Sequence, residues 1–83
     1  MITKKEFQQN LGRNLRHIRM LKNMTLEQLA LLVGMSYSQV SRIELGKINT
    51  SAFTVFVLAN TLSVEPAEFF QPTLASVTKK VVG

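Results

Sequence analysis

Side chains able to carry covalent or metal chemistry are scarce in this sequence. The chain has no Cys, one His at position 17 and only five Asp and Glu residues. A thiol nucleophile and a Gly-rich phosphate loop are both missing, and a single imidazole cannot assemble a zinc site. The residue types therefore argue against an enzyme, and they predict neither a metal nor another cofactor.

The chemistry that remains is the binding of a polyanion by basic side chains. The chain carries a net charge of +5, and residues 1–47 hold eight of its ten Lys and Arg against three Glu. The positive charge therefore belongs to the N-terminal half, which favours nucleic acid as a partner. For Arg13 and Arg16, a purely solvated surface is an equally good interpretation.

The length limits what else the protein can contain. With 83 residues it can form one compact domain, which leaves no room for a separate ligand-sensing domain. So small a core supplies only about 3 to 5 kcal/mol, and no disulfide or metal adds to it, so association with another subunit is expected. The lack of Cys, of an apolar leader and of a membrane-length apolar run predicts a cytoplasmic protein without a membrane partner.

The elements that must position the basic side chains are amphipathic helices. Apolar residues recur at intervals of four, four and three positions, at Phe7, Leu11, Leu15 and Ile18. This spacing predicts a first helix that ends near Lys22 and has these four residues on its core face. A second helix follows a capping-box pattern, Thr25 to Gln28, and buries Leu26, Leu29, Ala30 and Val33 before the turn at Gly34.

A second capping-box pattern, Ser36 to Gln39, predicts a third helix from about Tyr37 to Leu45. Its apolar content is thin, because only Val40 and Ile43 face inward. A short, capped helix with a polar outer face is typical of an element held in place so that this face can touch a partner.

The C-terminal half has a different pattern, because the segment from Ser51 to Leu62 is almost wholly apolar. One inward stripe can use Ala52, Val55, Leu58, Ala59 and Leu62. A second stripe remains that a monomer cannot easily bury, and together with a later aromatic residue it predicts a dimer interface of Phe53, Phe56, Val57 and Phe70. Covering of this stripe by the C-terminal tail is the alternative.

A short fifth helix is expected to begin at Glu65 and Pro66 and to end at Phe69 and Phe70. Residues 73–83 form a tail whose pattern fits a helix, a strand or no fixed structure.

Residues 11–19, 24–30, 33–36 and 40–47 together resemble the lambdoid repressor and Cro-like helix-turn-helix family, the xenobiotic-response-element class. The order of Leu29-Ala30, Gly34, Ser36 and Ile43 to Gly46 carries the resemblance, which covers roughly residues 7–70. It implies an all-α, five-helix DNA-binding domain over residues 1–72, with the helix-turn-helix at about 25–46 and the dimerising part at about 51–71. Residues 73–83 follow it as a tail.

The resemblance also implies roles for individual residues. Base contacts are expected from the third helix, at Tyr37, Ser38, Ser41 and Arg42. Arg42 is the best candidate for contacting a guanine, because its guanidinium group can donate two hydrogen bonds to O6 and N7. Phosphate contacts are expected from Thr25, Gln28, Gln39, Lys47, Asn49 and Arg13. Arg19 and Glu44 are expected to pair and to fix the third helix. Leu26 stands where the family usually has a phosphate-binding Gln, so that contact is not expected in this chain.

Three functions fit these expectations. The first is a sequence-specific regulator of transcription that binds duplex DNA as a homodimer on a two-fold operator. The second is an antitoxin that binds a protein partner and represses its own promoter, and the third is the controller of a restriction-modification cassette. Only residues 73–83 are free to serve as a dedicated protein-binding segment.

Overall fold

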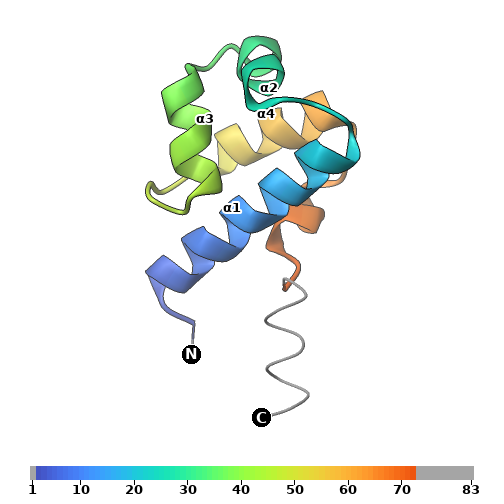
Figure 1. The fold of residues 1–83 in the computed structure, drawn as a ribbon. Coiled ribbons are helices and arrows are strands. Elements are labelled where there is room, and N and C mark those ends of the chain that lie inside the picture. The colour runs from blue at the N-terminus through green and yellow to red at the C-terminus, as the bar shows by residue number, and fades with distance from the viewer. Residues whose placement is uncertain (1, 73–83) are drawn as a thin grey trace.

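The computed structural model describes residues 2–72, and within that range the chain contains helices and loops but no strand. The elements are α1 (Lys4–Leu21), α2 (Leu26–Val33), α3 (Tyr37–Glu44), α4 (Ala52–Leu62) and a 3-10 helix (Pro66–Phe70). In Figure 1 the long α1 crosses the front of the molecule, α4 runs behind it, and α2 and α3 lie at one end. The expectations for residues 73–83 lie outside the described residues.

Each α-helix begins at a hydroxyl side chain. Every cap oxygen accepts the backbone N–H of the residue three positions later at 3.1 Å, and the caps are Thr3, Thr25, Ser36 and Ser51. The two predicted capping boxes are both present, because Gln28 and Gln39 accept the backbone N–H of Thr25 and Ser36 at 2.8 and 3.1 Å. These caps satisfy donors that the first turn of a helix leaves unpaired.

Among the described residues, one left-handed residue follows each of the four α-helices, at Asn23, Gly34, Gly46 and Ser63. Gly34, with φ of 70°, ends α2 and brings α3 to start only three residues later. Gly46, also at 70°, turns the chain after α3. Both predicted glycine positions therefore need a backbone conformation that residues with a Cβ adopt at a cost.

The core lies where α1 and α4 pack with the buried faces of α2, α3 and the 3-10 helix. It contains Leu11, Leu15, Ile18, Leu29, Ala30, Val40, Ile43, Val55, Leu58, Ala59, Leu62 and Phe69. Two expectations are wrong in this region. Ala52 is exposed because it lies in the first turn of α4, beyond the core. Phe7 is exposed near the start of α1, where its ring stacks on Phe70 at a centroid distance of 5.8 Å.

The fifth element is a 3-10 helix, so the expected five-helix domain has, within residues 2–72, four α-helices and one 3-10 helix. The segment has five residues, and Pro66 at its start has no N–H to donate. The N–H of Glu68 donates to the carbonyl of Glu65 at 3.0 Å, which is the three-residue spacing of a 3-10 turn.

Two asparagines on successive turns of α1 hold the end of this segment. Asn14 Nδ2 donates to the carbonyls of Phe69 and Gln71 at 2.8 and 2.6 Å, and Asn10 Nδ2 donates to that of Gln71 at 2.9 Å. They tie residues 69–71 to α1 and so hold Phe69 in the core and Phe70 against Phe7.

None of the helices between residues 2 and 72 has the length and apolar character that crossing a membrane requires.

Candidate nucleic-acid interface

The outer face of α3 is polar and open to solvent. Val40 and Ile43 are the buried residues of this helix, the Glu44 side chain is largely buried in an ion pair, and the other five residues are exposed or half-buried. Of the four predicted base readers, Tyr37, Ser38 and Arg42 are exposed and Ser41 is half-buried. The structure therefore brings these four residues together on one accessible helix of eight residues, which has the width to enter a major groove.

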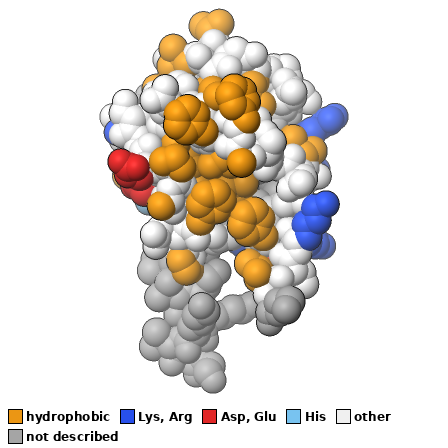
Figure 2. All heavy atoms as spheres, turned by 180° about the vertical axis from the view of Figure 1, so that it is seen from behind, with side chains coloured by type: hydrophobic (Ala, Val, Ile, Leu, Met, Phe, Trp, Pro, Cys, Tyr) orange, Lys and Arg blue, Asp and Glu red, His pale blue; other side chains and the backbone are white. Residues whose placement is uncertain are grey.

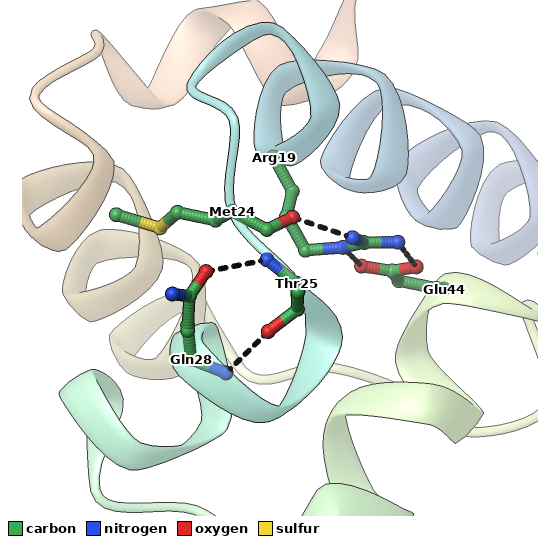
Figure 3. Close-up of polar contacts among 5 residues, drawn as sticks. All are labelled: Arg19, Met24, Thr25, Gln28 and Glu44. Atoms are coloured by element: carbon green, nitrogen blue, oxygen red, sulfur yellow. Dashed lines mark hydrogen bonds and ion pairs between the residues drawn. The ribbon is translucent and has the colours of Figure 1, made fainter.

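An ion pair ties the end of α3 to α1 and to the loop before α2 (Figure 3). Arg19 Nε and Nη2 donate to the two carboxylate oxygens of Glu44 at 2.7 and 3.1 Å, and Nη1 donates to the Met24 carbonyl at 2.8 Å. The two side chains are 13% and 7% exposed. The expected partners are thus joined in a two-pronged contact, which suits a structural role better than contact with a ligand.

The hydrogen bond with Glu44 raises the pKa of Arg19, against the opposing effect of burial. The guanidinium therefore stays charged throughout the neutral range. Because the pair joins α1 to the last residue of α3, it sets the direction in which the outer face of α3 points.

A close approach of α1 to α3, which the sequence pattern did not reveal, also fixes α3. A Cβ at Gly12 would collide with the carbonyl oxygens of Ile43 and Glu44. Only glycine at this position lets the two backbones come so near. The signal that could have found it is a lone Gly inside an otherwise regular amphipathic pattern, which often marks a packing requirement.

Five of the six predicted phosphate contacts fall into two groups. Thr25, Gln28 and Gln39 lie in the first turns of α2 and α3, where their oxygens take part in the capping boxes. Figure 3 shows the Gln28 amide nitrogen on the side away from Thr25. Lys47 and Asn49 are exposed in the loop between α3 and α4.

The last predicted phosphate contact, Arg13, stands apart from these groups. It is exposed on α1, and no hydrogen bond or ion pair within residues 2–72 joins it to α2, to α3 or to the loop after α3.

The predicted dimer residues lie on another side of the molecule. Phe53 and Phe56 on α4 are 76% and 57% exposed, Val57 is half-buried, and Phe70 is exposed and stacked on Phe7. We call Phe7, Phe53, Phe56 and Phe70 the aromatic surface. Figure 2 shows hydrophobic side chains gathered in the middle of this side, with Lys and Arg side chains mainly at its right edge.

Residues 15–69 match the model of the family described as helix-turn-helix, HTH_3. None of the curated protein sequences compared with the chain matches it.

Several solved structures are similar to the chain. One is the restriction-modification controller protein C.AhdI from Aeromonas hydrophila, 36% identical over 76% of this chain and 96% of that one, with a TM-score of 0.73. Another is the clp gene regulator ClgR from C. glutamicum, 26% identical over 77% of this chain and 82% of that one, with a TM-score of 0.75.

A third similar structure, the hypothetical transcription factor NHTF from Neisseria, is 22% identical. The match covers 95% of this chain and 91% of that one, with a TM-score of 0.79. At this level of identity it shows a similar fold alone. The family match spans well over half of the residues, and it agrees with the capped α2–turn–α3 unit. The chain belongs to the HTH_3 family of Cro/C1-type helix-turn-helix transcription regulators.

Proposed function

We propose that this protein regulates transcription by binding a specific duplex-DNA sequence as a homodimer. The observation that supports this most is the polar outer face of α3, which no other described element covers. Gly12 and the Arg19–Glu44 pair hold that face in one orientation. A recognition helix needs such a fixed direction, because each base contact depends on the angle at which a side chain arrives.

In the proposed complex α3 lies in the major groove. Arg42 donates two hydrogen bonds to O6 and N7 of a guanine, and Tyr37, Ser38 and Ser41 contact neighbouring base edges. The phosphates on either side are held by Thr25, Gln28, Gln39, Lys47, Asn49 and Arg13. These contacts set the register, while the bases supply the specificity.

The proposed dimer uses Phe53, Phe56, Val57 and Phe70, since exposed rings on one side of a small domain favour association. A two-fold axis through this surface uses each ring twice and presents two copies of α3 to grooves about 34 Å apart. In this proposal residues 1–72 are the DNA-binding domain, residues 25–46 read the DNA and residues 51–71 dimerise. Such a regulator would act in the cytoplasm, on the DNA there.

Selection from a random duplex pool tests the proposal. The purified protein should enrich an inverted repeat, and hydroxyl-radical footprinting should show protection of both half-sites on one side of the helix. Enrichment of single half-sites would contradict the dimer. A failure to enrich any duplex sequence, with folded protein, would contradict sequence-specific binding itself.

A restriction-modification controller is the more specific version of this function. Its support is the 36% identity to C.AhdI over 96% of that protein. A controller that activates at one site and represses at another responds in two directions to its own concentration. A reporter driven by the upstream region of the gene should then rise at low protein concentration and fall at high concentration. Repression at every concentration would favour a plain repressor.

A further inference from the structure

The proposed contacts leave a basic cluster at the start of α1 unused. Lys4 and Lys5 are exposed in the first turn of α1, and neither forms an ion pair among the described residues. Lys47 is exposed in the loop after α3. These residues are far apart in the sequence, so their relation depends on how that loop meets α1.

The loop meets α1 at Gly46. A Cβ on Gly46 would lie 2.7 Å from the Gln9 Cα and 2.9 Å from its Cγ, so the main chains of the two segments are in close contact. Gln8 Nε2 donates to the Gly46 carbonyl at 3.3 Å. Figure 1 shows the loop after α3 beside the N-terminal half of α1. The loop is therefore attached to the second turn of this helix.

This junction places Lys5 and Lys47 on the same side of the molecule. Residues three and four apart share one side of a helix, so Lys5 lies one turn, about 5.4 Å, before Gln8 and Gln9. Lys47 directly follows the residue that those glutamines contact.

The nearby acidic groups have hydrogen-bond partners other than Lys5 and Lys47. Glu6 accepts a hydrogen bond from Thr3 at 3.0 Å, and Glu44 is held by Arg19. Neither Lys5 nor Lys47 forms an ion pair among the described residues, and Lys47 lies shortly after the C-terminal end of α3.

We propose that Lys5 adds a phosphate contact next to that of Lys47, so that both lysines bind the backbone of the same duplex that α3 reads. The inference rests on the proposed function, and the partner is the phosphodiester backbone because positive charges on one side of the protein complement the negative charges of the phosphates. Lys5 adds affinity without sequence preference, and the Gly46–Gln8 contact couples its position to that of α3.

The salt dependence of operator binding measures this contact. We expect Lys5→Gln to lower the slope of log affinity against log salt by about 1.8 per dimer, since each phosphate contact contributes about 0.9. Between 50 and 200 mM salt, wild type should therefore lose about twelve-fold more affinity than the variant. Lys5→Arg is the matched control, which keeps the charge and should keep the slope. Circular dichroism of both variants checks that α1 is intact.

Neutral methylphosphonate linkages, placed one at a time in the operator, locate the contact. At one phosphate in each half-site the linkage should weaken wild type and Lys5→Arg but leave Lys5→Gln unchanged. An unchanged salt slope for Lys5→Gln, or a slope reduced equally in Lys5→Arg, overturns the inference. So does equal weakening of all three proteins at every linkage. A wild-type protein that selects no duplex sequence overturns the proposed function as well, which separates the two failures.

Discussion

The outer faces of α3 and α4 contrast within one small molecule. Both helices start at a capping serine and both bury one side, yet α3 buries two residues and α4 buries four. The remaining surface of α3 is mostly hydroxyl, amide and guanidinium groups, whereas that of α4 carries Phe53 and Phe56. The outer face of α3 suits a hydrated, charged partner, and that of α4 suits an interface that excludes water.

The contrast extends to what holds each helix in place. α4 is anchored by its own apolar residues, so its position follows from hydrophobic burial. α3 has too few apolar residues for that, and Gly12 and the Arg19–Glu44 pair add the constraint. A helix whose surface is reserved for polar contacts must be positioned by other parts of the chain.

The largest expected effect comes from making the α4 surface polar. Burying a Phe side chain contributes about 1.5 to 3 kcal/mol, and the proposed dimer uses both rings twice. Phe53→Gln with Phe56→Gln should therefore weaken dimerisation by about 4 kcal/mol or more, roughly a thousand-fold. Operator affinity should fall with it, while weak, salt-sensitive binding to any DNA persists. Sedimentation equilibrium over a concentration series measures the change.

Leu31→Gln is the control for that experiment. Leu31 on α2 is 82% exposed and lies outside the aromatic surface, so its loss should leave dimerisation unchanged. Normal dimerisation of the double Phe variant, or a wild type that is monomeric at tens of micromolar, would show that α4 is not the interface. Residues 73–83 would then become the leading candidate.

The next effect concerns the support of α3. Glu44→Ala leaves the Arg19 guanidinium largely buried without its carboxylate, so the free energy of unfolding should fall by about 3 kcal/mol. The raised pKa of Arg19 means that its stabilising contribution is complete at neutral pH and is lost only as pH rises through that pKa. Thermal and urea unfolding of the DNA-free protein test this prediction, and an unaltered midpoint would contradict it.

The features that could be predicted from the sequence are those set by neighbours along the chain. A capping box needs only residues three apart, so Thr25 with Gln28 and Ser36 with Gln39 were recognisable without knowledge of the fold. The turn at Gly34 and the apolar spacing of α2 are local for the same reason. The pairing of Arg19 with Glu44 followed from family resemblance, since no local rule joins residues so far apart.

The features that could not be predicted depend on segments that meet only in the folded chain. Asn10 and Asn14 look like ordinary polar residues of α1 until residues 69–71 lie beside them. Phe7 fitted the core periodicity of α1, but α1 extends beyond the core there, and its ring packs on Phe70 instead. Periodicity identifies the side of a helix that is apolar, but it does not show how far along the helix the core reaches.

A third prediction tests whether the α3 face reads bases. Arg42 is exposed in the last turn of α3, where its guanidinium group can donate two hydrogen bonds to one guanine. Arg42→Ala should cost about 1 to 3 kcal/mol on the selected operator and should relax preference at one base pair in each half-site. Binding to the selected operator and to variants at each position, with random duplex for comparison, measures this. Equal losses on specific and random DNA would show that Arg42 only neutralises phosphate.

The smallest expected effect is that of Lys47→Ala, and it distinguishes the two kinds of contact near α3. Lys47 is exposed directly after the turn at Gly46, so it can reach the backbone but has no helix to direct it toward a base edge. Its loss should weaken binding to all sequences alike, by about 1 kcal/mol per contact near physiological salt, and should lower the salt slope by about two units per dimer. Titrations of selected and random duplex at several salt concentrations give both quantities. A selective loss on the operator would make Lys47 a base reader, and an unchanged slope would remove it from the interface.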